Sequence, residues 1–156
     1  RRQGPKESVV FNTLTDWITS EDPRIKYYSG TADYTNTFTI KEIPSQPTYI
    51  NLGKVVAMAK VYLNGKYVGG AWTYPYRLNI TDYLQKGENT VKIEVVNNWV
   101  NRLIGDLKLP AEQRSTWTMV NPWRDDSQLQ SSGLFGPVRI ESHDYELLKF
   151  SPLSDN

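Results

Sequence analysis

The sequence predicts an all-β protein, folded as an antiparallel β-sandwich of about eight short strands. Two observations predict this class. Apolar and polar residues alternate with a period of two in several runs, and clusters of turn-forming residues separate those runs. Extended 3.6-residue periodicity is not evident, so we do not expect the repeated crossover helices that a parallel sheet needs.

Three runs show the alternation most clearly, at residues 32–40, 91–95 and 138–141. In each run the apolar side chains fall on one face and the polar or charged side chains on the other, which is typical of a strand with one buried face. The apolar face of the first run carries Ala32, Tyr34, Phe38 and Ile40.

A tight hairpin is predicted at residues 60–68, where Asn64-Gly65 separates two alternating runs. A type I′ turn needs a positive φ at both central residues, and Asn-Gly reaches that conformation at little cost. The two-residue loop also fixes the strand register. The expected cross-strand pairs are Leu63 with Lys66, Tyr62 with Tyr67, and Val61 with Val68.

The segment after this hairpin is less regular. Residues 80–84 predict a single capped helical turn, and residues 86–89 predict a turn. Residues 101–136 show neither the period of two residues of a strand nor the 3.6-residue period of a helix. An irregular segment of that length is unusual inside a compact domain. We expect it to be a functional loop or an insertion that docks on a neighbouring domain.

The length of 156 residues fits one domain with a continuous core. We expect residues 1–24 to form an N-terminal extension packed on the sandwich, residues 25–150 to form a single domain, and residues 151–156 to form a disordered tail. The two ends are interpreted as domain boundaries within a longer protein. The side chains of the extension expected to contact the sandwich are Val9, Val10, Phe11 and Trp17.

Composition excludes several classes of function. The absence of cysteine rules out a disulfide framework, a thiolate zinc site and a cysteine nucleophile, although it leaves the compartment open. The 18 Lys and Arg balance the 17 Asp and Glu without clustering, so neither a nucleic acid nor a membrane is expected as a partner. The five Trp and ten Tyr suit a sugar-facing surface or a sandwich core equally well.

Eight segments together carry a family resemblance, and their combination is specific although no single motif is. They are residues 25–34, 52–55, 59–69, 72–76, 80–81, 87–90, 98–106 and 132–138. In this combination the chain resembles the galactose-binding-like jelly-roll domain of glycoside hydrolases. It is most similar to the C-terminal region of large bacterial α-L-rhamnosidase-type enzymes, and more distantly to the sugar-binding domain of family 2 β-glycosidases.

The resemblance implies a jelly roll beside a separate catalytic domain, often a TIM barrel, for which this chain is too short. It implies that the partner is the catalytic domain of the same polypeptide, with glycans as a second class of partner, and that the location is extracellular or periplasmic. In family 2 β-galactosidases an aspartate before the Ser-Gly-Ile-Phe-Arg segment helps to complete the active site. Asp125 and Asp126 lie near that position but not at it, and Gly136-Pro137 replaces the Arg-centred ending.

Candidate catalytic groups are few. Hydrolysis of a glycoside needs two carboxyl groups flanking the bond, and the irregular segment contains Asp106, Glu112, Asp125 and Asp126. Such segments normally carry solvated acids, so we expect no catalytic pair and no enzymatic activity in this chain alone. The single histidine, His143, is expected in a surface turn because no serine-centred motif accompanies it.

No cofactor is expected. A structural calcium ion would need oxygen ligands gathered around Asp33 or around Asp125-Asp126. Neither place has the spacing of an EF-hand loop, and two adjacent acids do not easily point at one ion. A calcium site is therefore not predicted.

Aromatic side chains near expected strand ends are the candidates for ligand binding or domain docking, since a ring can stack on the apolar face of a pyranose while polar groups bind its hydroxyls. Three alternatives stay open. The rings bind sugar, dock the catalytic domain, or belong to the scaffold, in which case Trp72 and Trp99 cap the core and Asn101 and Arg102 hold loop backbone. The candidate residues are Trp72, Tyr74, Tyr76, Trp99, Asn101, Arg102, Trp117, Trp123, Asp125 and Asp126.

Overall fold

The computed structural model of the chain describes residues 4–142. Antiparallel strands dominate it, as predicted, and no helix among these residues is long and apolar enough to cross a membrane. The larger sheet has the order β1-β7-β4-β5 and consists of β1 (Thr31–Ile40), β7 (Gly87–Val96), β4 (Met58–Leu63) and β5 (Lys66–Ala71). The second sheet has the order β6-β2-β9 and consists of β6 (Arg77–Asn79), β2 (Thr48–Asn51) and β9 (Arg139–Ser142). The predicted tail at 151–156 and the predicted turn at His143 lie outside the described residues.

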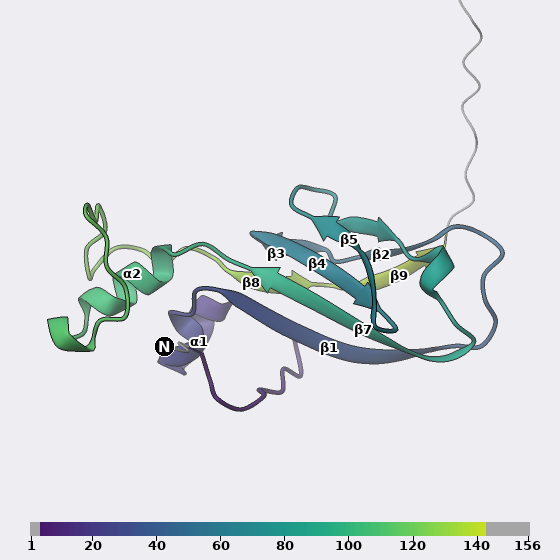
Figure 1. The fold of residues 1–156 in the computed structure, drawn as a ribbon, viewed down its shortest axis with the longest axis horizontal. Coiled ribbons are helices and arrows are strands. Elements are labelled where there is room, and N and C mark those ends of the chain that lie inside the picture. The colour runs from purple at the N-terminus through teal and green to yellow at the C-terminus, as the bar shows by residue number, and fades with distance from the viewer. Residues whose placement is uncertain (1–3, 143–156) are drawn as a thin grey trace, which may run out of the picture.

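The two sheets stack as a sandwich, with β5 lying against β6 and a short pair formed by β3 (Lys54–Val56) and β8 (Gly133–Gly136) at one end (Figure 1). Apolar side chains of both sheets fill the space between them. Members of this core that are almost fully buried include Ile50, Leu52, Val61, Leu63, Ile93, Val95 and Leu134.

The alternating runs form strands as expected. Along β7 the side chains of Val91, Ile93 and Val95 are buried, while Lys92 and Glu94 between them are partly exposed. β7 is the central strand that pairs with both β1 and β4. Its strict period of two therefore fixes which face of the whole four-stranded sheet is buried.

The predicted hairpin is confirmed in its turn but not in all of its register. Asn64 and Gly65 have φ of 52° and 78°, and the pairs Leu63 with Lys66 and Tyr62 with Tyr67 are present. The predicted pair of Val61 with Val68 is wrong, because the register shifts there and Val61 lies opposite Gly69. A β-bulge of this kind adds a residue to one strand, which the length of the turn does not reveal.

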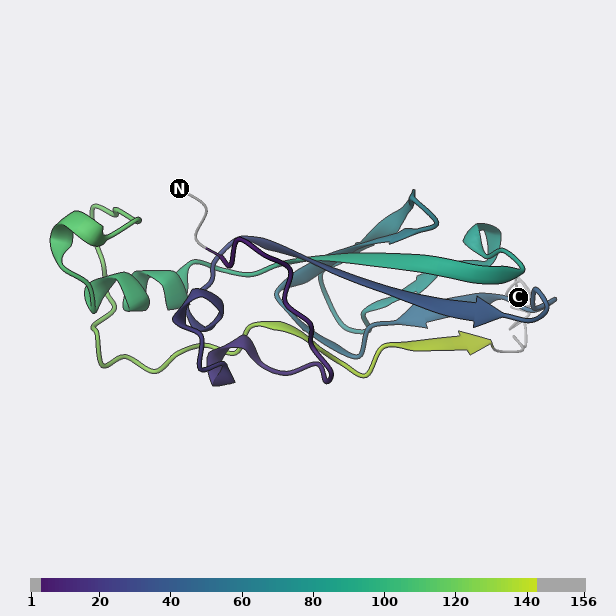
Figure 2. The same cartoon turned by 90° about the horizontal axis from the view of Figure 1, so that it is seen from below.

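The prediction that residues 101–136 are irregular is wrong at both ends. Helix α2 (Val100–Leu107) follows β7, and strand β8 closes the segment, with a 3-10 turn η3 (Ala111–Gln113) between them. The predicted helical turn near residue 80 is present as η2 (Thr81–Tyr83), without a capping side chain. Figures 1 and 2 show that α2 and its following loop project from one end of the sandwich.

The N-terminal segment reaches the sandwich mainly through Trp17 in the 3-10 turn η1 (Trp17–Thr19), which precedes the short helix α1 (Pro23–Lys26). Trp17 is 3% exposed, and its Nε1 donates to Tyr34 Oη at 2.6 Å. The expectation that Val10 packs on the sandwich is wrong, since its side chain is 84% exposed. Val9 and Phe11 also remain partly exposed. The segment therefore makes contact only in part.

Candidate functional site

The projection is named here the α2 lobe and comprises residues 98–131. Its base is tied to the sandwich by amide side chains. Asn97 at the end of β7 accepts from the Gly30 amide at 2.9 Å and donates to the Tyr28 carbonyl at 2.8 Å. Asn101 on α2 exchanges two hydrogen bonds with the backbone of Gln130, at 2.6 and 2.8 Å, and is 1% exposed. The entry and the exit of the lobe are thus joined.

A buried carboxylate organises the loop beyond α2. Asp106 is 2% exposed, and its Oδ2 accepts from the backbone amides of Ser115 and Thr116 at 2.9 and 2.7 Å. The Thr116 hydroxyl donates to the same oxygen at 2.6 Å. Arg102, one helical turn earlier, forms an ion pair with Oδ1 at 2.5 Å and also donates to Ser115 Oγ at 2.9 Å. Charge-assisted bonds of this kind are the strongest in proteins, so they hold the loop in one place.

The electrostatics agree with a carboxylate that stays charged. Burial raises the pKa of Asp106, but the hydrogen bonds from Thr116 and Ser115 and the charge of Arg102 lower it by more, so its pKa lies below the ordinary value. Four hydrogen bonds from Ser115 and Thr116 reach Oδ2, and the guanidinium of Arg102 lies against Oδ1. Asp106 therefore positions the loop that follows α2.

The loop that Asp106 holds presents apolar side chains to solvent. Trp117, Met119 and Val120, named here the apolar tip, are 82%, 85% and 76% exposed. Trp99 at the start of α2 is also 63% exposed, which contradicts its alternative assignment as a cap on the core. Large apolar groups clustered on one short loop are typical of a surface that meets another protein.

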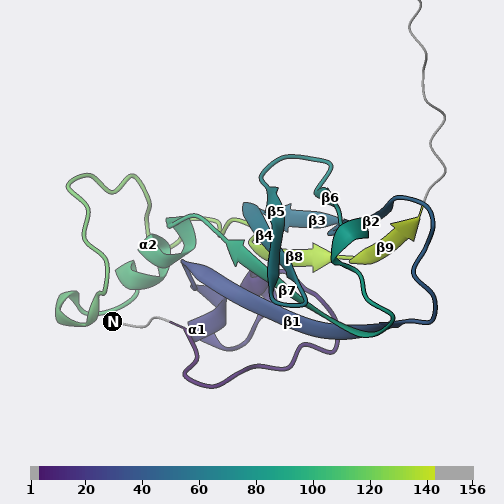
Figure 3. The same cartoon turned by 45° about the vertical axis from the view of Figure 1, so that its right-hand side comes forward.

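Three of the other predicted aromatic residues lie together in a loop outside the α2 lobe. Trp72 and Tyr74 lie in the loop between β5 and β6 and are 72% and 82% exposed, so Trp72 does not cap the core either. Tyr76 is half-buried, with its hydroxyl 3.5 Å from the carbonyl oxygen of Ala57. Figures 1 and 3 show this loop well separated from the α2 lobe along the molecule. The predicted residues do not form one site.

Within the lobe, the polar candidates are scaffold or surface. Asn101 and Arg102 hold loop backbone and side chains, as one alternative expected. Asp125 and Asp126 are exposed, and the Asp125 carbonyl accepts from Lys108 Nζ. Trp123 is partly buried. Among residues 4–142 no three His, Cys, Asp or Glu side chains gather in a way that suits a metal ion.

Comparison with known proteins gives the family. The sequence profile described as "Glycosyl hydrolase 2 galactose-binding domain-like" matches residues 10–128, which is most of the chain. The chain belongs to this family. The galactose-binding-like resemblance and the β-sandwich class read from the sequence are both confirmed.

Relatives of this galactose-binding-like domain are glycoside hydrolases. The solved structure of a rhamnosidase from Novosphingobium sp. PP1Y superposes with a TM-score of 0.83 and is 42% identical over 89% of the chain. A protein of Formosa agariphila named "Putative beta-glucuronidase" is 37% identical over 85% of the chain, and a beta-galactosidase of Priestia megaterium is 31% identical over 99%. The chain spans only 13–14% of the length of these three proteins.

The sequence prediction of this galactose-binding-like domain missed helix α2 and the role of Asp106. The signal was present but short. Arg102 and Asp106 have the i,i+4 spacing of a helical ion pair. A helix of eight residues shows barely two turns of its period, so this spacing was the better indicator.

Proposed function

We propose that this galactose-binding-like domain is a non-catalytic accessory module of a larger glycoside hydrolase, and that its α2 lobe docks on the catalytic domain of the same polypeptide. The observation that supports this proposal is the apolar tip, whose side chains are 76–85% exposed although a buried ion pair holds the loop in place. Ordering such a loop costs conformational entropy, and burial of its apolar side chains offsets that cost only when another surface covers them.

The parent enzyme is proposed to be of the α-L-rhamnosidase type and to act outside the cytoplasm. The 42% identity to the Novosphingobium rhamnosidase, over nearly the whole module, supports this assignment. The module covers 13% of that protein, which leaves ample length there for a catalytic domain. The lobe would then stabilise that domain or border the substrate approach.

If the α2 lobe docks on the catalytic domain, Trp117→Ala should act differently in the isolated chain and in the full-length parent. In the isolated chain Trp117→Ala should leave the unfolding temperature within about 1 °C, because an exposed ring contributes little. In the full-length parent it should destabilise the module's contact with the catalytic domain by about 2 kcal/mol or more, which is the usual cost of truncating an interface anchor. Glu112→Ala, an exposed residue of the same lobe, is the matched control. Equal behaviour of Trp117→Ala in both proteins would exclude docking through this ring.

The non-catalytic assignment has its own test. The purified chain should not hydrolyse aryl rhamnosides, galactosides or glucuronides, since Asp106 is fully engaged and Asp125 and Asp126 are solvated. Turnover that survives repurification and is lost in Asp125→Ala would show that the chain is an enzyme.

A second candidate, an autonomous carbohydrate-binding module, is favoured by one separate feature of the larger sheet. On its outer face Gly70 lies opposite Lys60, with exposed Tyr67 and Trp72 on either side. A Cβ at Gly70 would lie 3.5 Å from Tyr67 Oη and 3.7 Å from Trp72 Cζ3, so both rings lean over the glycine. The result is an aromatic shelf with a cation beside it, which suits the apolar face and the hydroxyls of a pyranose.

Sugar binding at this aromatic shelf leads to a result that docking of the α2 lobe does not predict. Titration of the isolated chain with oligosaccharides should give a saturable change in tryptophan fluorescence that Trp72→Ala abolishes and Trp117→Ala retains. A response lost in Trp117→Ala instead would place sugar at the apolar tip, and absence of any response would leave the accessory role as the sole proposal.

A further inference from the structure

The outer face of the larger sheet carries a row of charged side chains that crosses its strands. Glu94 on β7 lies opposite Lys60 on β4, and Lys60 lies opposite Gly70 on β5. Asp33 on β1 lies opposite Glu94. Both neighbours of Lys60 in β4 are buried, so this row faces away from the core. It runs from two acids at the β1 side to a cation beside the glycine of the aromatic shelf.

The two acids of this row already have a cationic partner. Lys92 Nζ lies 2.6 Å from Glu94 Oε1 and 3.9 Å from Asp33 Oδ2. The second oxygen of Glu94 lies 3.5 Å from the Tyr62 hydroxyl. Lys60 is exposed on the same face and forms no ion pair within the part of the chain that the structure describes. Lys60 is therefore the cation beside the shelf that remains for a ligand.

Distance decides which of these charges a ligand on the shelf meets. Neighbouring strands lie about 4.8 Å apart. Lys60 is one strand away from Gly70, whereas Glu94 is two strands away and Asp33 is three. Two and three strands correspond to about 10 and 14 Å, which exceed the screening length of about 8 Å at physiological salt. The charge nearest to the shelf is therefore positive, and the acids are largely screened.

The tyrosine of the shelf is held in place by the next row of side chains. The ring centroids of Tyr67 and Tyr62 are 5.4 Å apart, and Lys92 Nζ lies 4.3 Å from the centroid of Tyr62. These contacts orient Tyr67 before a ligand binds, which lowers the entropy cost of binding. The missing side chain at Gly70 lets a ligand approach the backbone beside Trp72, which is 72% exposed.

We propose that the aromatic shelf binds an anionic sugar, whose pyranose ring stacks on Trp72 and whose carboxylate or sulfate group pairs with Lys60 Nζ. This inference rests on the second candidate function above, that the shelf binds sugar, and adds the class of sugar that it takes. A neutral pyranose can use the stacking alone. A negative group gains a charge-assisted hydrogen bond from Lys60 in addition.

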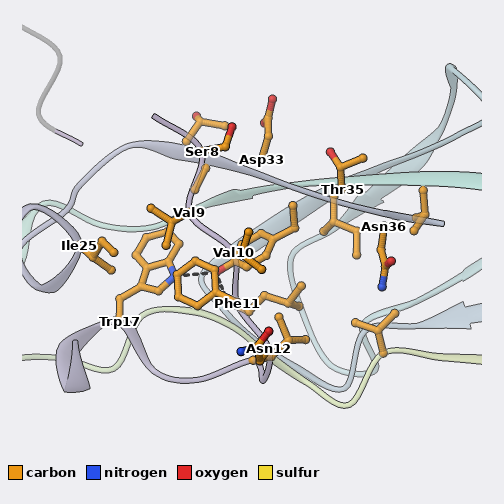
Figure 4. Close-up of a pocket in the computed structure, with 18 of the residues that line it drawn as sticks. Ser8, Val9, Val10, Phe11, Asn12, Trp17, Ile25, Asp33, Thr35 and Asn36 are labelled. Atoms are coloured by element: carbon orange, nitrogen blue, oxygen red, sulfur yellow. Dashed lines mark hydrogen bonds between the residues drawn. The ribbon is translucent and has the colours of Figure 1, made fainter. Parts of the chain in front are cut away.

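The cleft between the two sheets offers no such cation. It has a volume of about 780 Å³ and lies under the N-terminal segment (Figure 4). Its floor is apolar, and the Trp17 indole N–H on its wall already donates to Tyr34 Oη. The described residues that line it include the acids Glu7 and Asp33 but neither lysine nor arginine. An anionic sugar would therefore be desolvated and repelled there, and the shelf is the better site for it.

Matched pairs of oligosaccharides test the proposal by titration of the 156-residue chain, followed by tryptophan fluorescence. One pair is an oligogalacturonate and its neutral methyl ester, and the other is a sulfated galactan oligosaccharide and its desulfated form. Each charged probe should bind about three- to fivefold more tightly than its neutral partner, as expected for one exposed ion pair. The difference should vanish at about 1 M salt, where the screening length falls to about 3 Å. A preference confined to one pair would identify the anionic group as a carboxylate or as a sulfate ester.

Substitutions assign the preference to one side chain. Lys60→Gln should bring the charged probes to the affinity of their neutral partners, which should bind as before, and Lys60→Arg should retain the preference. Lys66→Gln is the matched control, because Lys66 is an exposed lysine of the same hairpin whose register partner, Leu63, faces the core. Trp72→Ala should abolish the binding of all four probes.

Three results would overturn the proposal, and they separate it from the function on which it rests. Equal affinity within both pairs would exclude an anionic ligand but leave the shelf as a sugar site. No binding of any probe would exclude both. A preference that survives Lys60→Gln would assign the anion to another cation. Docking by the α2 lobe is tested separately, because Trp117→Ala should leave all four affinities unchanged.

Discussion

Asp106 and Thr116 are joined by two hydrogen bonds to one carboxylate oxygen, at 2.7 Å from the Thr116 amide and 2.6 Å from its hydroxyl. This pair connects helix α2 to the residue that immediately precedes the apolar tip. The position of Trp117 is therefore set by a buried charge one residue away, and the predictions below begin from this connection.

Asp106→Asn should loosen the α2 lobe while leaving the sandwich folded. The amide cannot accept the same set of bonds and leaves Arg102 without its counter-charge, a loss of about 3 kcal/mol for a buried pair. Hydrogen exchange of residues 108–131 should accelerate, while β4 and β7 exchange as before. Asp126→Asn, at an exposed position of the same lobe, should shift stability by no more than about 0.5 kcal/mol.

The same carboxylate predicts a pH dependence with a defined sign. The pKa of Asp106 is lowered from its ordinary value of 3.8, with burial opposing and the bonds from Thr116 and Ser115 outweighing it. Its stabilising contribution is therefore complete above that ordinary value, and is lost as pH falls through the lower folded pKa. The Thr116 amide resonance should hold steady from pH 7 down to about 4 and move only in stronger acid. If Asp106→Asn showed the same acid transition, another group would be responsible.

Gly105→Ala should destabilise the junction of the lobe, against the usual preference for alanine in helices. Alanine is favoured over glycine by about 1 kcal/mol in a helix interior. Here, however, a Cβ would lie 2.6 Å from Tyr27 Cγ, at the rigid base of the ring. Combining the change with Tyr27→Ala should remove the penalty, as thermal unfolding of the two single variants and the double variant would show. An additive double variant would mean that the clash is not the cause.

Gly65→Val should lower stability by about 2 kcal/mol, because a β-branched residue at a φ of 78° is strained and the turn offers no compensating contact. The unfolding temperature should fall by about 4–8 °C for a chain of this size. Gly70→Ala is the matched control, since its φ is not positive and a Cβ there makes only ordinary contacts. An unchanged Gly65→Val protein would mean that the hairpin turn contributes little to the fold.

The parts of the fold that the sequence predicted are those in which one local rule decides the outcome. The alternation along β7 and the Asn64-Gly65 turn each depend on neighbours two residues apart, and both were read correctly. The bulge opposite Val61 depends on the pairing of two strands and leaves no periodic pattern in the sequence. The short helix α2 packs on the distant Tyr27, beneath Gly105, and its local signal is limited to the i,i+4 spacing of Arg102 and Asp106.

In the candidate site, too, some roles could be predicted from the sequence and others could not. Trp117 was named from the sequence as a candidate contact residue on the irregular segment, with a buried scaffold role left open, and its ring is exposed. Asp106 was considered only as a candidate acid, because a carboxylate that binds backbone amides nine and ten residues later shows no local pattern. Burial, which the sequence does not display, separates a structural carboxylate from a solvated one.

The most direct test of docking is oxidative footprinting of the apolar tip. Hydroxyl radicals should label Trp117 and Met119 readily in the isolated chain, where both are exposed. In the full-length parent we predict that the labelling of both residues falls at least about tenfold, while Tyr67 on the outer sheet face changes little. Equal labelling of Trp117 and Met119 in the isolated chain and in the parent would contradict the claim that this lobe docks on the catalytic domain.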